Sequence, residues 1–174
     1  MTTHSSGPSH YPVLVIGGGQ AGLSMSYYLK EMGLDHLVFE KNTAVHGWKN
    51  ERWDSFTLVT PNWQCDLPGH PYDGDDPRGF MTRQEIIGYL ERFVAKLDAP
   101  LREGVSVNTV RTDADGLYHV STSDGEYTAD QVVVASGGYH VPVIPRMAER
   151  LPESVLQMHS AQYKNSGQLP EGSV

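Results

Sequence analysis

The sequence predicts an α/β fold that combines a parallel sheet with an antiparallel β-meander. Two apolar runs, at residues 13–16 and 131–136, are typical of strands buried on both faces of a parallel sheet. A glycine cluster and a helical segment follow the first run, which is the strand-turn-helix order of doubly wound folds. Between the two runs, alternating residues with Asp-Gly turns indicate antiparallel hairpins.

Composition limits the class of protein. The chain has 174 residues, 39% of them hydrophobic and 20% charged, as expected of about one globular domain. A net charge of -8 with no Lys/Arg run argues against a nucleic-acid partner, and the apolar runs are too short for a membrane span. Cys65 is the only cysteine, so no intrachain disulfide and no Cys-rich metal site can form, and no histidine spacing suggests a metal. We therefore expect a cytoplasmic protein without a metal site.

The first elements follow in the order strand, helix, strand. The small polar residues at the start lack the apolar segment of a signal peptide, so we predict a disordered tail over 1–11 and one domain over 12–174. Residues 13–16 predict a strand and residues 20–32 a helix. Gly33 stands where a helix end needs the left-handed conformation. His36–Glu40 (HLVFE) predicts a second buried strand.

Residues 41–81 interrupt this alternation. Trp48, Trp53 and Trp63 are interleaved with prolines, and few periodic runs occur. A loop of this length in a compact domain is usually functional, and its tryptophans argue against disorder. Core packing and a place in a binding site are equally good interpretations of Trp48 and Trp63.

Periodic structure returns after the loop. Thr82 and Glu85 form a capping box, and apolar residues at helical spacing extend the helix to Leu97. Asp-Gly pairs at 115–116 and 124–125 predict hairpin turns. The remaining predicted elements are meander strands over 105–112, 117–123 and 126–129, a buried strand over 131–136, a short helix near 146–150 and a strand near 155–158.

Residues 17–22 (GGGQAG) match the pattern G-x-G-x-x-G between a strand and a helix. Gly17 permits the sharp turn, Gly19 lets the backbone approach a pyrophosphate, and Gly22 allows the helix to pack closely on the sheet. The helix N-terminus carries partial positive charge with no acid nearby, and Glu40 follows at the distance suited to ribose hydroxyls. This context favours a dinucleotide site over a tight turn alone.

The elements after Glu40 bear on which dinucleotide is bound. A nicotinamide-binding domain would continue with a helix and a strand, whereas this chain has an aromatic loop, a helix and a meander. In these features the chain resembles the flavin-containing monooxygenases, two-dinucleotide-binding-domain flavoproteins that include indole-pyruvate-type and Baeyer–Villiger enzymes. The resemblance rests on GGGQAGL, Glu40-Lys41, Gly47-Trp48 with Arg52, WDSFTLVTPN with CDLP, ASGGYHVPVIP, and HSAQYK at 159–164.

The resemblance implies FAD as the cofactor and a set of residues that bind it. Gly47 and Trp48 would line the ribityl and phosphate region, Thr60 and Asn62 would approach the isoalloxazine ring, and the Val107 backbone would read the adenine edge. Asn62 is equally well explained as a turn residue after a proline. The full set is Gly17, Gly19, Gln20, Ala21, Gly22, Glu40, Lys41, Gly47, Trp48, Arg52, Thr60, Asn62, Val107, Ala135 and Gly137.

The resemblance also implies a function. It is that of an NADPH-dependent monooxygenase, which activates oxygen at the flavin and inserts one oxygen atom into a small-molecule substrate. The chain would be its N-terminal portion, without the second domain that binds NADPH. An exposed sheet edge or apolar face would then favour a homo-oligomer or stabilisation by FAD.

Other functions stay open at this point. The first alternative is a flavin-binding dehydrogenase or a non-catalytic FAD-binding fragment, and the second is an NAD(P)-binding regulatory module. Disulfide exchange within the chain needs two cysteines, so Cys65 is better interpreted as a small, buried apolar side chain. No catalytic residue stands out, as expected where a cofactor carries the chemistry.

Overall fold

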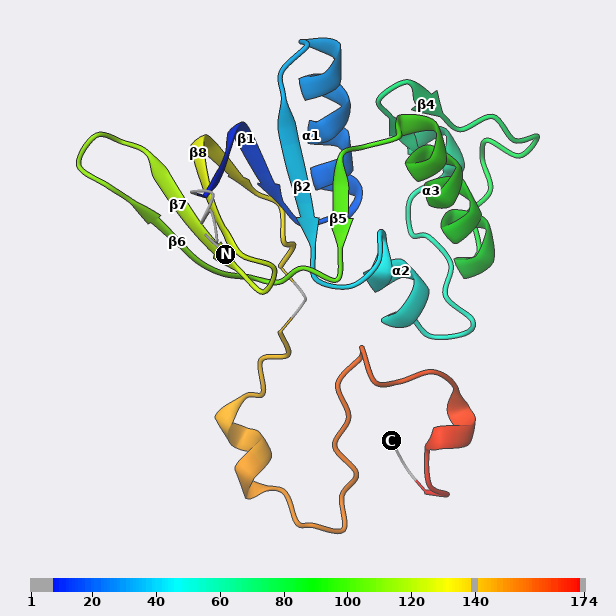
Figure 1. Ribbon diagram of the computed structural model, residues 1–174. Helices are drawn as coiled ribbons and strands as arrows, with labels where there is room; N and C mark the ends of the chain where they lie inside the picture. The colour runs from blue at the N-terminus through cyan, green and yellow to red at the C-terminus, as the bar shows by residue number, and fades with distance from the viewer. Residues whose placement is uncertain (1–7, 139–140, 173–174) are drawn as a thin grey trace, which may run out of the picture.

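A six-stranded sheet lies at the centre of the fold in the computed structural model, which describes residues 8–138 and 141–172 (Figure 1). The strand order is β5-β2-β1-β8-β7-β6. β1 pairs in parallel with β2 and β8, β2 pairs in parallel with β5, and β7 pairs antiparallel with both β6 and β8. This confirms the predicted parallel sheet and meander. The strands are β1 Ser9–Ile16, β2 His36–Glu40, β5 Leu101–Glu103, β6 Val107–Thr112, β7 Tyr118–Thr122 and β8 Glu126–Val134.

The two edge strands of this sheet are neighbours in sequence. Only residues 104–106 separate β5 from β6, and such a connection spans at most about 14 Å. The sheet therefore curls until its edges meet at this corner. The curl encloses an apolar cluster made of Leu14, Leu37, Phe39, Val105, Val120, Tyr127 and Ala129.

Helix α1 (Gln20–Glu31) covers the other face of the parallel strands and packs through Leu29 on a cluster of buried valines. The buried His36 imidazole joins the helix to β2. Its Nδ1 lies 2.9 Å from the Leu34 carbonyl, which can only accept, so Nδ1 carries the proton and Nε2 accepts from the Ser26 hydroxyl at 2.8 Å. Gly33 has φ +67 just after the helix, which confirms the predicted left-handed end.

Helix α3 (Arg83–Leu97) lies beside α1 and does not cover the sheet (Figure 1). Both hydrogen bonds of the Thr82–Glu85 capping box are present. The apolar face of α3 packs against Leu23 of α1 and against the long loop, which contributes Val45 and Met81. The loop contains short elements that were not predicted: α2 His46–Asn50, a 3₁₀ turn Asn62–Gln64, β3 Asp66–Leu67 and β4 His70–Pro71.

Several sequence predictions are corrected here. β8 is one continuous strand, although its two halves were predicted as separate strands, because it pairs with β1 along its length while its first half also pairs with β7. β1 begins at Ser9, so the predicted tail is wrong at residues 9–11, while residues 1–7 lie outside the described part of the chain. β5 was not predicted, and residues 155–158 form no strand. A 3₁₀ helix over Arg146–Arg150 confirms the predicted short helix.

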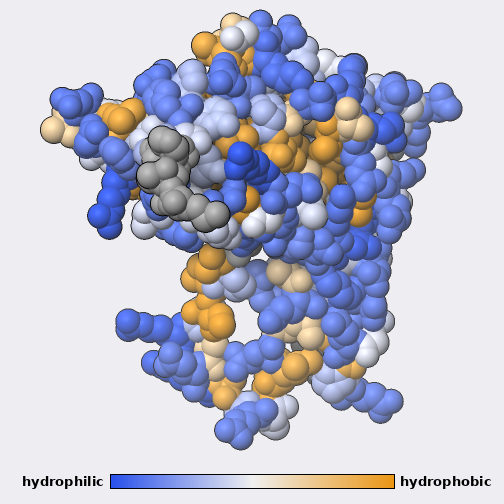
Figure 2. All heavy atoms as spheres, viewed as in Figure 1, coloured by the Kyte–Doolittle hydropathy of each residue, from blue (hydrophilic) through white to orange (hydrophobic). Residues whose placement is uncertain are grey.

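Residues 141–172 extend away from the sheet and include a third 3₁₀ element, Ser166–Gln168, near their end (Figure 1). Apolar side chains on this segment are open to solvent, as Figure 2 shows. Lys164 attaches the segment to the long loop, because its ammonium group donates to the carbonyl oxygens of Asn50 and Arg52. Within the described ranges, no helix is long and apolar enough to cross a membrane.

Candidate dinucleotide-binding site

A cavity of about 980 Å³ opens at the carboxyl ends of β1, β2 and β8. This is where ligands bind in open α/β sheets. α2 and the first part of β6 form its other walls. Twelve of the fifteen residues predicted from the sequence line it: Gly17, Gly19, Gln20, Ala21, Glu40, Lys41, Gly47, Trp48, Arg52, Val107, Ala135 and Gly137.

The three motif glycines differ in what surrounds them. A Cβ on Gly17, whose φ is +116, would lie 2.4 Å from the Ala135 carbonyl oxygen, and one on Gly22 would lie 1.9 Å from the Gly17 carbonyl oxygen. Both contacts are with backbone, so neither position admits a side chain. A Cβ on Gly19 would meet nothing within 4 Å. Two glycines thus close the turn against the sheet and the helix, and the third leaves the helix N-terminus open to the cavity.

The N-terminus of α1 contributes backbone N–H groups to the cavity. The first N–H groups of a helix have no partner inside it, and the helix dipole adds about half a positive charge there. No acidic side chain lies in the first turn of α1. Gly19 is the N-cap with extended backbone (φ -82, ψ -177), and it supplies no side-chain oxygen to these donors. This end of the cavity therefore suits an anion.

The Glu40 carboxylate is fixed at the end of β2 by two backbone hydrogen bonds. The Gly18 N–H donates to Oε2 and the Asn42 N–H donates to Oε1, each at 2.8 Å. Each carboxylate oxygen can accept more than one hydrogen bond. Glu40 is thus held in place with acceptor capacity left for hydroxyl groups, which is the property required of a ribose ligand.

The α2 wall carries an aromatic cluster. The Arg52 guanidinium lies over the Trp48 ring, 4.9 Å from its centroid, and Trp48 meets Phe56 edge to face at 5.9 Å. Trp48 both lines the cavity and packs against the apolar cluster around α3. Core packing and a place in the cavity wall, the two interpretations from the sequence, are therefore compatible for this residue. Trp63 is 61% exposed, which contradicts core packing for that residue.

Three predicted residues do not line the cavity. Gly22 packs against the glycine turn, as described above. Thr60 is exposed on the loop. The Asn62 side chain is buried inside the loop, where its amide donates to the Asp76 carbonyl at 2.9 Å and its oxygen accepts from the Met81 N–H at 2.7 Å. The structure thus gives this side chain a role in holding the loop together, as its position after a proline allows.

Sequence reasoning missed part of the wall. Val45 and Ser106 line the cavity, but neither belongs to a motif. Val45 has φ +55, a conformation that is rare for a β-branched residue, and its N–H donates to the Gly18 carbonyl at 3.1 Å. Backbone strain of this kind has no counterpart in sequence periodicity. Ser106 could have been found from its place between a parallel strand and the meander.

Two titratable groups in the apolar cluster around α3 are affected by burial. Cys65 is half-buried against the α3 core, and this burial raises the pKa of its thiol above the usual value. Burial also raises the pKa of the Tyr89 hydroxyl, which lies 3.1 Å from the Cys65 carbonyl oxygen. Among the described residues no group of three or more His, Cys, Asp or Glu side chains is arranged to hold a metal ion.

Comparison with known proteins agrees with this geometry. An oxidoreductase of Geobacillus kaustophilus, described as CzcO-like, is 43% identical over 93% of this chain and 46% of its own length. An indole-3-pyruvate monooxygenase of Arabidopsis thaliana is 28% identical over 88% of this chain and 39% of its own length. The chain therefore spans about half the length of the curated relatives it matches.

Solved structures show the same architecture. A flavin-containing monooxygenase from Stenotrophomonas maltophilia matches 92% of this chain and 48% of its own, with 27% identity and a TM-score of 0.80. A cyclohexanone monooxygenase from Rhodococcus matches 79% of this chain and 29% of its own, with 27% identity and a TM-score of 0.67. These findings confirm the resemblance to flavin-containing and Baeyer–Villiger monooxygenases. Residues 14–174 match the family described as pyridine nucleotide-disulphide oxidoreductase, and the chain belongs to that family.

Proposed function

We propose that this chain binds FAD in the cavity, with the pyrophosphate at the N-terminus of α1 and the adenosine ribose at Glu40. The glycine turn is the observation that carries the proposal. Gly17 and Gly22 exclude side chains because backbone lies against them, whereas the space beside Gly19 is open. The cavity volume of about 980 Å³ is also at the upper end of the range for ligand pockets, as a dinucleotide requires.

The residues of the chain then have distinct tasks. The free N–H groups at the start of α1 bind the pyrophosphate charge. The Glu40 carboxylate, already oriented by Gly18 and Asn42, accepts from the ribose hydroxyls. Trp48 and Arg52 form an apolar and cationic wall along the rest of the cofactor. FAD supplies the redox chemistry of its flavin ring, and the chain supplies binding, orientation and exclusion of water.

Titration of the purified chain with FAD, ADP and NADPH tests this proposal. We expect FAD to bind with a change in flavin absorbance, and ADP to compete for the same site. Protein that remains colourless after reconstitution and shows no heat of binding with FAD would refute the proposal. Tight binding of NADPH without FAD would support the NAD(P)-binding module instead.

For the whole protein we propose an NADPH-dependent flavin monooxygenase that acts on a small molecule with O2. The likeness to flavin-containing monooxygenases at 27% identity and a TM-score of 0.80 supports this activity. NADPH would bind to a part of the protein beyond this chain, because the FAD cavity accounts for the single glycine motif described here. Simultaneous measurement of NADPH oxidation and oxygen consumption tests this activity. In the presence of substrate a monooxygenase consumes both NADPH and O2, whereas a dehydrogenase oxidises NADPH without consuming O2.

Thiol-disulfide chemistry is a weaker candidate despite the family name. Exchange within the chain needs two cysteines, and the sequence has one. The likeness to a bacillithiol disulfide reductase of Staphylococcus aureus, at 21% identity, concerns the fold alone. Replacement of Cys65 by alanine should therefore leave FAD binding unchanged.

We also propose that the chain self-associates when it is prepared alone. Val143, Ile144 and Met147 are each at least 70% exposed, and an open apolar stretch of this kind favours association. Light scattering across a range of protein concentrations tests this. A mass that stays at that of one chain would contradict it.

A further inference from the structure

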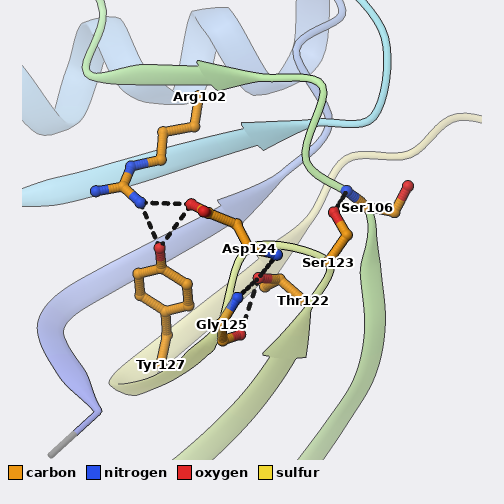
Figure 3. Close-up of polar contacts among 7 residues, drawn as sticks. All are labelled: Arg102, Ser106, Thr122, Ser123, Asp124, Gly125 and Tyr127. Atoms are coloured by element: carbon orange, nitrogen blue, oxygen red, sulfur yellow. Dashed lines mark hydrogen bonds and ion pairs between the residues drawn. The ribbon is translucent and has the colours of Figure 1, made fainter. Parts of the chain in front are cut away.

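Three polar side chains join β5 to the turn between β7 and β8 (Figure 3). Arg102 on β5 donates from Nη1 to Asp124 Oδ2 at 2.6 Å and to the hydroxyl of Tyr127. The Tyr127 hydroxyl in turn donates to Asp124 Oδ2 at 3.1 Å. These three residues, which we call the Arg102 latch, connect one edge of the curled sheet to the hairpin beside the other edge.

The turn that the latch holds is itself rigid. The Thr122 hydroxyl oxygen accepts from the N–H groups of Asp124 and Gly125, each at 3.1 Å, and the hydroxyl donates to the Gly125 carbonyl at 2.9 Å (Figure 3). Next to these bonds, Ser123 and Ser106 are paired twice. The Ser106 N–H donates to Ser123 Oγ at 3.0 Å, and the Ser123 N–H donates to the Ser106 carbonyl at 2.9 Å. The position of the turn therefore fixes the position of Ser106.

Residues 105–107 are the cavity wall opposite α2, and the chain holds them from two sides. On one side the Val105 N–H donates to the Glu40 carbonyl at 2.9 Å, and the Glu103 carboxylate accepts from the Ala44 N–H at 2.6 Å. On the other side they are held by the two bonds with Ser123 and by the pairing of Val107 with Thr122 in the β6–β7 ladder. The β7–β8 and β8–β1 ladders connect this second hold to the parallel sheet, and the latch adds a direct side-chain link from the turn to β5.

Tyr127 links the latch to the strand that carries Glu40. Its ring is 5% exposed and meets Phe39 edge to face at 4.9 Å, and Phe39 precedes Glu40 in β2. The hydrogen bond to Asp124 raises the pKa of the Arg102 guanidinium, and burial raises the pKa of the Tyr127 hydroxyl. Both groups therefore keep their protons at neutral pH and can donate the hydrogen bonds of the latch.

We propose that the Arg102 latch positions the wall at residues 105–107 and thereby sets the affinity of the cavity for the adenosine half of its ligand. This inference rests on the proposed function. Arg102, Asp124 and Tyr127 do not line the cavity, so they are positioning residues and make no contact with the ligand. Their effect reaches the ligand through Ser123 and Ser106.

The test compares Arg102→Met, Asp124→Asn and the double variant with the unaltered chain. Methionine keeps an unbranched apolar side chain and removes the guanidinium, whose Cζ lies 5.6 Å from the centroid of the Tyr127 ring. His119→Ala is the matched control, because it breaks the hydrogen bond between His119 Nε2 and Asp113 Oδ2 in the β6–β7 hairpin, whose side chains are about as exposed as Arg102 and Asp124. Dissociation constants for FAD, ADP and FMN are measured for each protein, together with amide exchange of the peptide that contains Ser106.

We expect each latch variant to bind FAD and ADP about three- to tenfold more weakly, the range that the loss of one hydrogen bond produces. FMN, which lacks the adenosine, should bind as it does to the unaltered chain, and the double variant should be no weaker than either single one. The exchange rate of the Ser106 amide should rise in the latch variants and stay unchanged in His119→Ala.

Two results would overturn the inference while leaving the proposed function intact. One is unchanged ADP affinity in the latch variants, and the other is an equal loss of FMN affinity, which would indicate general loosening of the fold. An unaltered chain that binds neither FAD nor ADP would refute the proposed function and this inference with it.

Discussion

Substitution at Gly19 separates ligand binding from folding more sharply than any other change in the glycine turn. In Gly19→Asn the new Cβ meets no protein atom within 4 Å, and the extended backbone of Gly19 suits any residue. Asparagine is a better N-cap than glycine, because its side-chain oxygen accepts from N–H groups in the first helical turn. Those N–H groups are the ones that a pyrophosphate would need.

The magnitudes follow from this competition. Folding stability of Gly19→Asn should stay within about 0.5 kcal/mol of the unaltered chain, since a few tenths separate glycine from the best N-caps. FAD binding should weaken at least about tenfold, or about 1.4 kcal/mol, because the side chain fills the approach path and occupies the donors. In the matched variant Gly22→Ala, the Cβ would lie 1.9 Å from the Gly17 carbonyl oxygen. We expect it to cost about 3 kcal/mol of stability or more, as overpacking against backbone does.

Urea unfolding followed by tryptophan fluorescence measures the first effect, and calorimetric titration with FAD at low temperature measures the second. The two variants should affect different properties: Gly19→Asn loses affinity and keeps stability, whereas Gly22→Ala loses stability. FAD binding by Gly19→Asn as tight as that of the unaltered chain would refute the placement of the pyrophosphate at the α1 N-terminus.

The remaining predictions concern folding and reactivity. The Thr82 hydrogen bonds lower the pKa of Glu85 below its usual value of 4.5. The stability that Glu85 contributes is therefore fully present above pH 4.5 and is lost as the pH falls through the lowered pKa. The free energies of urea unfolding of Glu85→Gln and of the unaltered chain should differ at pH 7 and converge near pH 2. Because burial raises the pKa of Cys65, iodoacetamide should alkylate it more slowly in the folded chain than in urea at pH 8, and equal rates would contradict this. Tyr89→Phe removes the acceptor for the Leu67 N–H and should cost about 1–3 kcal/mol in unfolding free energy; a loss below about 0.5 kcal/mol would show that the hydroxyl is dispensable.

Local chemistry explains which parts of the fold could be predicted. The glycine turn, β2 and the start of α3 each depend on residues within a few positions of one another, as the Thr82–Glu85 capping box shows. The junction inside β8 depends on partners far away in sequence. Asp130 interrupts an apolar pattern and favours a break, but pairing of β8 with β1 from Ser9 to Ile16 keeps the strand continuous across it.

The α2 wall could not be predicted for the same reason. A helix of five residues is too short to be stable alone, and His46–Asn50 has no capping side chain. The structure holds it through distant groups: the Arg83 guanidinium donates to the Lys49 carbonyl, and the Lys164 ammonium donates to the Asn50 carbonyl. The family resemblance identified Gly47 and Trp48 as site residues, but it did so by analogy with other chains and did not predict the contacts that hold them in place.

Lys164 also explains how the segment HSAQYK at 159–164 is joined to the cavity wall. This segment ends in Lys164, whose ammonium group donates to the carbonyl oxygens of Asn50, Arg52 and Ala161, two of them at the end of the cavity wall. Glu153 and Val155, which precede the segment, are both exposed. Because these acceptors belong to α2, to the long loop and to the segment itself, one long cationic side chain joins all three, which a run of apolar or small residues at the same place would not do.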